Sequence, residues 1–330
     1  MMVRFGLLGA GRIGKVHAKA VASNPQGKLV AVADAFDKAA SELAGTYGAA
    51  VRSIEEIEKS ADIDAIIICT PTDTHADLIE RFARAGKAIF CEKPIDLDVK
   101  RVEKCLSVVV ETGTTLMVGF NRRFDPHFAA VRKAIDDGAI GDVEMVTITS
   151  RDPGPPTHDY IARSGGIFRD MTIHDFDMAR VLLNEEPVAV SAHASVLVDK
   201  RIGELGDFDS ASVILETASG KQCVISNSRR ATYGYDQRIE VHGSKGMVSA
   251  ENQRPVSIEV ANAEGYTRPP LHDFFMTRYT QAYANEIAAF TETVTKGGEA
   301  LPGGRDGLIA LKLADAALRS VKEGRAIRLD

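Results

Sequence analysis

The sequence lacks an excess of basic residues. Its 330 residues include 40 lysines and arginines against 46 aspartates and glutamates, which gives a formal net charge of −6. A nucleic acid or an anionic membrane surface would require a basic patch, so this balance predicts neither as a partner. The chain also lacks any apolar run near the roughly 18 to 20 residues that a membrane span needs.

Cysteine is scarce as well. The four cysteines are Cys69, Cys91, Cys105 and Cys223. No two of them have the CxxC spacing or the spacing of a zinc site, so no metal is predicted. We expect them to be small buried residues in a reducing compartment. The first residues also lack the basic segment and the cleavage site of a signal peptide, so we expect none, and a cytoplasmic location.

The remaining composition is that of an ordinary globular protein, with 45% apolar and 26% charged residues. The length suggests two domains. Over the first 120 residues, short apolar runs alternate with amphipathic helical stretches. The apolar runs are Val3–Leu8, Leu29–Ala33, Ala65–Cys69, Ala88–Cys91 and Thr115–Phe120. Because buried parallel strands are continuously apolar and need helical crossovers, this alternation predicts an α/β fold with a doubly wound parallel sheet.

The rhythm changes after about residue 123, where longer strand-like segments follow one another between glycine-containing turns. These segments are Val143–Ser150, Val188–Val198, Ser210–Glu216, Gln222–Ser228, Arg238–Val241 and Val256–Val260. They predict a second, α+β domain with a large, mainly antiparallel open sheet. The tail from Tyr279 is helical again. We therefore predict domains at 1–120 and 121–330, with a C-terminal helix that can pack back on the first domain.

The first apolar run leads into the GxGxxG turn Gly9-Ala10-Gly11-Arg12-Ile13-Gly14. Alone this motif is weak, but here it follows a predicted strand and opens a predicted helix. The first glycine permits a tight turn, the second lets the backbone approach a pyrophosphate, and the third lets the helix pack on the strand. The helix N-terminus offers N–H groups to the phosphates. We predict dinucleotide contacts at Gly9, Gly11, Arg12, Ile13 and Gly14.

Asp34 ends the second apolar run, 20 positions after Gly14. A carboxylate at this place is expected to bind the ribose hydroxyls of a dinucleotide. Its charge would repel the 2′-phosphate of NADP, so the predicted cofactor is NAD. The alternative is an ordinary strand–turn–helix corner with a solvated aspartate.

The loops after the later strands should line the same crevice, because ligands bind beyond the carboxyl ends of parallel strands. The cofactor contacts predicted in these loops are Thr70, Pro71, Thr72, His75, Glu92 and Lys93. For His75 the alternative is a place in the first turn of the next helix. Lys93 could stabilise a developing alkoxide or pass on its proton. The alternative for Lys93 is a surface lysine before a turn-forming proline.

A second cluster consists of Asp170 and His174, four residues apart. If a helix opens here, both project from one face, and the carboxylate keeps the imidazole available as a base. Oxidation of a secondary alcohol needs such a base, because the hydroxyl loses a proton as hydride leaves. A helix-capping pair remains an alternative. A metal site with Asp175 and Asp177 is another, although successive helical residues point in different directions.

Together, the GxGxxG turn, Cys91-Glu92-Lys93-Pro94 and Asp170-Met171-Thr172-Ile173-His174-Asp175 resemble the glucose–fructose oxidoreductase/inositol dehydrogenase family. The resemblance covers essentially the whole chain and looks closest to the bacterial myo-inositol 2-dehydrogenases. It implies a Rossmann domain followed by an α/β domain. Because the large open sheet of that second domain commonly forms subunit contacts, a homotetramer is implied.

The resemblance also implies an activity, the NAD-dependent oxidation of myo-inositol to scyllo-inosose. Lys93 matches the family's catalytic lysine, and Asp170 with His174 matches its catalytic acid-and-histidine pair. The implied substrate contacts are Lys93, Arg122, Asp152, Asp170, His174, Tyr233 and Tyr235. Asp152 falls near where some inositol dehydrogenases use a different polar residue, and one of the two tyrosines is implied to reach the substrate.

Three other functions remain open on the sequence. The same hydride transfer could act on another polyol or sugar, because the motifs do not fix which hydroxyl is aligned. A regulatory protein that senses NAD or a sugar without turnover would keep the cofactor turn but break the catalytic set. NAD-assisted glycoside cleavage on a related scaffold is the third alternative.

Overall fold

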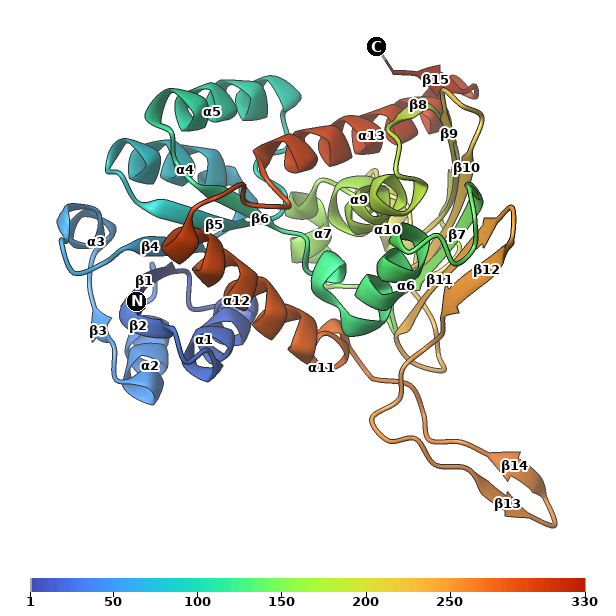
Figure 1. Cartoon of the computed structure of the whole chain (residues 1–330), viewed down its shortest axis with the longest axis horizontal. Helices are drawn as coiled ribbons and strands as arrows, with labels where there is room; N and C mark the ends of the chain where they lie inside the picture. The colour runs from blue at the N-terminus through green and yellow to red at the C-terminus, as the bar shows by residue number, and fades with distance from the viewer. Residues whose placement is uncertain (1, 330) are drawn as a thin grey trace. The chain divides into compact units, whose positions relative to one another are not determined.

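A computed structural model describes residues 2–329 of the chain (Figure 1). The chain divides into two compact units. The first runs to Asp125 and also contains Thr280–Leu311, while the second contains Pro126–Tyr279 and the residues from Lys312 onward. The first unit thus includes a helix from the C-terminal part of the sequence in addition to the N-terminal strands.

The first unit is built on a six-stranded sheet in which every pair of neighbouring strands is parallel. Its strands, in spatial order, are β3 (Ala50–Val51), β2 (Gly27–Ala33), β1 (Val3–Leu8), β4 (Ala65–Ile68), β5 (Ala88–Glu92) and β6 (Leu116–Gly119). The order reverses at β1, which is the arrangement of a doubly wound Rossmann sheet. The predicted fold of the N-terminal part is confirmed.

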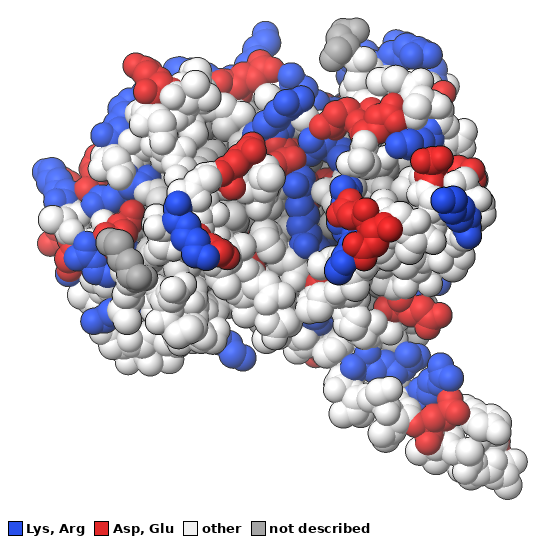
Figure 2. All heavy atoms as spheres, in the orientation of Figure 1, with Lys and Arg blue, Asp and Glu red and all other residues white. Residues whose placement is uncertain are grey.

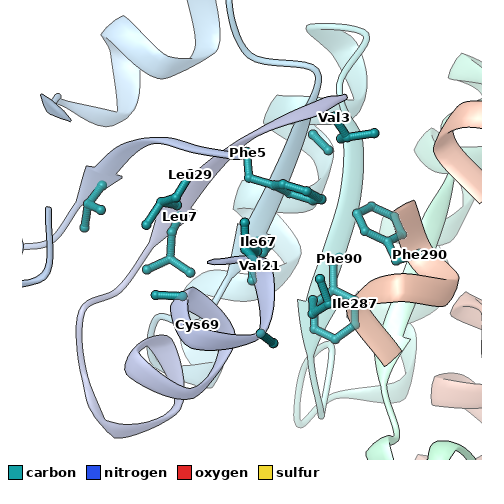
Figure 3. Packing of buried hydrophobic residues seen from close by; sticks show 14 of the residues in the cluster. Val3, Phe5, Leu7, Val21, Leu29, Ile67, Cys69, Phe90, Ile287 and Phe290 are labelled. Atoms are coloured by element: carbon teal, nitrogen blue, oxygen red, sulfur yellow. The ribbon is translucent and has the colours of Figure 1, made fainter. Parts of the chain in front are cut away.

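Helices connect these strands, as parallel pairing requires. They are α1 (Arg12–Ser23), α2 (Asp37–Tyr47), α3 (Ile54–Lys59), α4 (His75–Arg84) and α5 (Val99–Thr112), with the short 3-10 helices η1 (Thr72–Thr74) and η2 (Asn121–Phe124). The helix α12 (Thr280–Lys296) packs against α1. Its Phe290 ring lies 6.2 Å from the ring centre of Phe5 and 5.8 Å from that of Phe90. Figure 3 shows this packing of α12 on the strands β1 and β5.

The second unit contains a seven-stranded sheet. Its spatial order is β12 (Gly246–Ala250), β11 (Asp236–Gly243), β7 (Val143–Arg151), β10 (Gln222–Ser228), β9 (Ser210–Thr217), β8 (Pro187–Ser195) and β15 (Ile327–Arg328). All neighbours are antiparallel except β7 and β10. The prediction of a large, mainly antiparallel sheet is confirmed, and the one parallel pair makes the sheet mixed. The two strands of that pair are far apart in sequence, so a hairpin cannot join them.

One face of this sheet is covered by the helix α9 (Thr172–Leu183), which contacts β7 and β10. The other helices named in this part of the chain are α6 (Pro126–Asp136), α7 (His158–Ser164), α8 (Ile167–Asp170), α10 (Lys200–Glu204), α11 (Phe275–Arg278) and α13 (Gly304–Glu323). Buried and exposed residues alternate along β9, so the opposite face of the sheet is open. This is the period-two pattern of a strand with one covered face.

A hairpin of β13 (Val260–Asn262) and β14 (Gly265–Thr267) forms a separate two-stranded sheet at the end of an extended arm (Figure 1). The strand expected at Val256–Val260 is therefore wrong in its position, since the paired residues begin at Val260. Residues 256–258 carry no strand pairing and precede the hairpin.

All four cysteines are buried and unbridged, as expected. Burial raises the pKa of each thiol, to about 12 for Cys105. On the face shown in Figure 2, acidic and basic side chains lie intermixed. Within residues 2–329, no helix combines the length and the apolar character needed to cross a membrane.

Candidate active site

The GxGxxG turn has the backbone geometry of a dinucleotide cradle. Gly9 has φ +97°, and a Cβ there would lie 2.6 Å from the carbonyl oxygen of Cys69. A Cβ on Gly14 would lie 2.0 Å from the carbonyl oxygen of Gly9. Around Gly11, by contrast, a Cβ would meet no atom within 4 Å. The first and third glycines are thus required by packing, while the open space over Gly11 fits the approach of a pyrophosphate.

The N-terminus of α1 faces the same turn. Gly11 is the N-cap, and no side chain caps the helix there. The first turn of α1 contains no acidic residue, so the positive end of the helix dipole is available to an anion. This arrangement and the open space over Gly11 fit a diphosphate group.

Asp34 lies directly after β2, and the turn holds its carboxylate. The Ala10 N–H donates to Oδ2 of Asp34 at 2.6 Å, and the Phe36 N–H donates to Oδ1 at 2.8 Å. Both hydrogen bonds hold the carboxylate in one orientation. The negative charge is thus fixed beside the second glycine of the turn, where it fits the ribose hydroxyls of NAD and opposes a 2′-phosphate.

The loop after β4 is braced from within. The hydroxyls of Thr70 and Thr74 lie 2.6 Å apart, and the Thr74 hydroxyl donates to the Pro71 carbonyl oxygen at 2.7 Å. His75 is buried, with Nε2 2.8 Å from the Thr70 carbonyl oxygen and Nδ1 2.8 Å from that of Pro94. Its ring ties the loop after β4 to the loop after β5. A direct cofactor contact of His75 stays a prediction.

Glu92, the last residue of β5, turns its carboxylate toward the buried side of the unit. Oε1 of Glu92 lies 2.6 Å from Nε2 of His17 on α1, and His17 is fully buried. Gly119 of β6 leaves room for this carboxylate, since a Cβ there would lie 3.1 Å from it. The next residue, Lys93, is half-buried at the carboxyl end of β5. The edge of the sheet expected to bind ligands therefore carries Lys93, with Glu92 and His17 behind it.

A second carboxyl group, Glu286 of α12, lies close to Glu92. It is fully buried, and neither of its carboxyl oxygens has a hydrogen-bond partner among the described residues. Burial, and to a smaller extent the charge of Glu92, raise the pKa of Glu286 well above its usual range. Burial thus favours the protonated form of the Glu286 carboxyl group.

Arg122 lies in η2, directly after β6, and is almost fully buried together with its neighbour Asn121. A guanidinium group is rarely buried unless charged or polar groups surround it. Its place after β6 fits the predicted role at the ligand-binding edge of the sheet, which stays a prediction.

Asp170 is the last residue of α8 in the second unit, and both of its carboxylate oxygens have donors. The Tyr160 hydroxyl donates to Oδ1 at 2.8 Å. The Arg229 guanidinium donates to Oδ2 from Nη1 at 3.3 Å and from Nη2 at 3.4 Å. The carboxylate is thus ordered and paired with a positive charge, as an orienting group for an imidazole should be.

His174 lies in the first turn of α9, where its N–H donates to the Met171 carbonyl oxygen at 3.3 Å. The expectation that one helix carries both Asp170 and His174 is wrong. α8 ends at Asp170 and α9 begins at Thr172, with Met171 between them at φ −98° and ψ −60°. The two residues still belong to adjoining helices that contact each other.

The neighbouring Asp175 serves the packing of α9. Oδ1 of Asp175 accepts from the Ser150 hydroxyl at 2.8 Å, and Oδ2 accepts from the Asn227 side chain at 2.8 Å. Asp175 is thereby fixed to β7 and β10 and is fully buried. Its carboxylate is directed to the sheet, which opposes the reading of His174 and Asp175 as ligands of one ion.

The remaining predicted substrate residues have unlike surroundings. Asp152 is half-buried directly after β7, where its N–H donates to the Ser228 carbonyl oxygen at 2.9 Å. Tyr233 is 50% exposed, and its hydroxyl donates to Asp236 at 2.6 Å. Tyr235 is 6% exposed, with its ring edge-on to Tyr279. Tyr233 is therefore the more accessible of the two tyrosines.

Sequence reasoning missed several residues of this arrangement, namely His17, Tyr160, Asp207, Arg229 and Glu286. Some of their partners are distant in sequence, as with Arg229 and Asp170, which are 59 positions apart, and His17 and Glu92, which are 75 positions apart. The signal available in the sequence is weak. Only the burial shows that Arg229, which is fully buried, differs from its exposed neighbour Arg230.

Comparison with known proteins adds the family. Residues 3–120 match the model described as an oxidoreductase family with an NAD-binding Rossmann fold, and residues 128–249 match the GFO/IDH/MocA C-terminal domain. A protein of Rhizobium meliloti (strain 1021) named inositol 2-dehydrogenase is 75% identical over 329 residues, covering 100% of both chains.

Solved structures agree with this match. The crystal structure of a myo-inositol dehydrogenase from Corynebacterium glutamicum is 44% identical, with a TM-score of 0.97 over 100% of this chain and 99% of that one. A scyllo-inositol dehydrogenase from Lactobacillus casei, solved with NAD(H) and scyllo-inositol, is 28% identical, with a TM-score of 0.92 over 99% of each chain. The chain belongs to the GFO/IDH/MocA family of oxidoreductases, whose N-terminal domain is an NAD-binding Rossmann fold.

Proposed function

We propose that this protein is an inositol 2-dehydrogenase that oxidises myo-inositol to scyllo-inosose with NAD. The observation that carries the proposal is the ordered carboxylate of Asp170, which Tyr160 and Arg229 hold four residues before His174. A cofactor-binding protein without turnover would not need an ordered carboxylate and a histidine so close in sequence. The choice of inositol rests on the relative that is 75% identical.

The cofactor is assigned to the first unit. NAD, when bound, supplies the acceptor for the hydride that leaves the substrate carbon. The backbone over Gly11 and the N-terminus of α1 would hold the diphosphate, and the Asp34 carboxylate would hold the adenosine ribose. Further contacts are assigned to Thr70, Pro71, Thr72, His75, Glu92 and Lys93.

The chain's own residues carry the proton chemistry. His174 takes the proton of the C2 hydroxyl on a ring nitrogen, and Asp170 stabilises the imidazolium that forms. Lys93 stabilises the negative charge that develops on the oxygen as the hydride leaves. Arg122, Asp152 and one of the two tyrosines, for which the exposed Tyr233 is favoured, are assigned to the other hydroxyls.

The main alternative is the same chemistry on another inositol isomer or a sugar. The Lactobacillus casei neighbour acts as a precedent, since it is named for scyllo-inositol. The deciding experiment is a steady-state screen of NADH formation with myo-inositol, scyllo-inositol, hexoses and pentoses. We expect the highest kcat/KM with myo-inositol. A higher kcat/KM with another polyol or sugar would make that compound the assigned substrate. No NADH formation with any of the compounds would refute the proposal that the protein is a dehydrogenase of this class.

We also propose that the protein is a cytoplasmic homotetramer whose contacts use the open face of the seven-stranded sheet. Thr147, Val224, Ile214 and Ser191 lie side by side in neighbouring strands, and their exposure places them on the open face. Ile214 is 48% exposed there. Small and apolar side chains on an open sheet face suit contact with a second copy. Four buried, unbridged cysteines suit a reducing compartment.

A further inference from the structure

A fully buried arginine connects two carboxylates in the second unit. The Arg229 guanidinium pairs with Oδ2 of Asp170 at 3.3 Å and with Oδ2 of Asp207 at 3.6 Å. Arg229 has 0% exposure, and the side chains of Asp170 and Asp207 are 12% and 9% exposed. Burial of two carboxylates so close together is costly unless a positive charge lies between them. The order Asp207, Arg229, Asp170 supplies that charge.

Asp207 also fixes the start of the helix that carries Asp170. The Ile167 N–H, at the beginning of α8, donates to Oδ1 of Asp207 at 2.9 Å. Gly166 precedes it with φ +86°, and a Cβ there would lie 2.7 Å from the same oxygen. Asp207 therefore holds the first residue of α8 directly and the last residue, Asp170, through Arg229.

Several groups act on the charge of Asp207. Burial raises the pKa of Asp207, while the Ile167 and Phe208 N–H groups and Arg229 act to lower it, and the Asp170 charge acts to raise it. Tyr160 of α7 is the group that donates to the other oxygen of Asp170. The nearest arginine on α8, Arg169, is bound to Asp315 of α13 instead. Arg229 is thus the cation that these contacts give to Asp170.

We infer that Arg229, held by Asp207, is a positioning residue for the proposed dehydrogenase reaction, keeping the Asp170 carboxylate ionised and oriented toward its role beside His174. This inference rests on the proposed function. Loss of the guanidinium would remove the positive charge that lies between two buried carboxylates, and protonation of one carboxylate would relieve their repulsion. A protonated Asp170 could no longer stabilise the imidazolium of His174.

The test compares Arg229→Gln, Arg229→Lys and the double variant Asp207→Asn/Arg229→Gln with the wild type. For Arg229→Gln we expect kcat to fall about 10- to 100-fold at pH 7, and the acidic limb of its pH profile to move up by about one unit or more. NAD dissociation constants should change less than about twofold. Arg229→Lys should restore most of the acidic limb, because it retains the charge. Arg230→Gln, at the exposed neighbouring arginine, is the matched control and should behave as wild type.

Two further measurements distinguish failure of this inference from misfolding of the variant and from failure of the proposed function. If Arg229→Gln does not fold, the double variant removes the unbalanced Asp207 charge together with the guanidinium. Its kcat should still fall, because Asp170 loses the hydrogen bonds from Arg229 that orient it, while its acidic limb should move little. Independently of turnover, the carboxyl carbon signal of ¹³C-labelled Asp170, assigned by its loss in Asp170→Asn, should titrate at higher pH in Arg229→Gln. An unchanged acidic limb and an unchanged Asp170 titration would overturn the inference. A wild type that oxidises no polyol, with the Asp170 titration shifted as expected, would instead refute only the proposed function.

Discussion

At the scale of single residues, the assigned chemistry depends on charges whose surroundings are defined. Asp34 is a carboxylate fixed by two backbone N–H groups. Asp170 is a carboxylate fixed by a phenol and a guanidinium. The role of each carboxylate can therefore be tested by replacing the aspartate with asparagine, which removes the negative charge and keeps the size of the side chain.

Replacement of His174 by alanine should abolish the base without disturbing the cofactor unit. We expect kcat to fall about 10²- to 10⁴-fold, the scale of general-base catalysis, with NAD affinity unchanged. Single-turnover NADH absorbance and NAD titration by calorimetry measure the two effects. His127→Ala, at an exposed histidine of α6, is the control. Near-full activity of His174→Ala would refute the assignment of His174 as the base.

The charge of Asp34 should decide the cofactor. We expect kcat/KM with NADP⁺ to be more than about tenfold lower than with NAD⁺, since the fixed carboxylate repels a 2′-phosphate. Asp34→Asn removes the charge and should narrow that ratio. Asp37→Asn, an exposed aspartate at the start of α2, should leave the ratio unchanged. Equal kcat/KM values for the two cofactors in the wild type would contradict the role of Asp34.

At the scale of elements, two glycines at the junction of β1 and α1 are needed for different reasons. Gly14 is needed for packing, and Gly11 is needed for cofactor binding. Gly14→Ala places a Cβ 2.0 Å from a carbonyl oxygen and should lower the free energy of unfolding by about 3 kcal/mol. Gly11→Ala meets nothing within 4 Å, so its stability should stay within about 0.5 kcal/mol of the wild type. Its NAD affinity should nevertheless drop about tenfold, because the methyl group occupies the path of the diphosphate. Denaturant unfolding and NAD titration test the pair, and unaltered NAD binding by Gly11→Ala would contradict the cradle.

The buried Glu286 of helix α12 should make the free energy of unfolding depend on pH. Its pKa is raised in the folded protein, so the folded state is disfavoured relative to the unfolded state as pH rises above the ordinary glutamate value toward the raised one. Over that window the free energy of unfolding of the wild type should fall, relative to Glu286→Gln, by about 1.4 kcal/mol per pH unit at most. Below the ordinary glutamate pKa, the difference in free energy of unfolding between the two proteins should no longer change with pH.

Urea unfolding at a series of pH values measures this difference. Glu292→Gln is the matched control on the same helix, because Glu292 is exposed and its pKa is lowered by the hydrogen bond from Lys296. Parallel stability curves for the wild type and Glu286→Gln between pH 5 and 9 would show that Glu286 ionises freely in the folded protein.

At the scale of the whole molecule, the open face of the seven-stranded sheet is the surface assigned to subunit contacts. Sedimentation equilibrium should give four times the mass of one chain. Ile214→Arg places a charge in the centre of that face and should shift the protein to smaller species. Val110→Arg, at an apolar position on α5 that is 80% exposed, should leave the mass unchanged. A monomeric wild type would contradict the proposed tetramer.

Sequence patterns alone were sufficient for much of the fold and of the cofactor site. The continuous apolar runs predict the strands β1, β2, β4, β5 and β6, because parallel strands that are buried on both faces are apolar along their whole length. The GxGxxG turn and Asp34 are close in the fold since consecutive strands of a doubly wound sheet pair with each other. Local chemistry and local topology agree there, and the structure bears out the geometry that they require.

The tertiary structure alone decided the surroundings of Asp170, Glu92 and Glu286. The pairs Asp170–Arg229 and Glu92–His17 join residues 59 and 75 positions apart. No periodicity or short motif records such contacts, because they depend on how separate helices and strands pack. Burial changes the chemistry too, since it raises the pKa of the Glu286 carboxyl group, whereas the hydrogen bond from Lys296 lowers the pKa of the exposed Glu292. The sequence by itself determined which residue types are available, and the packing decided which of them are charged, oriented and paired.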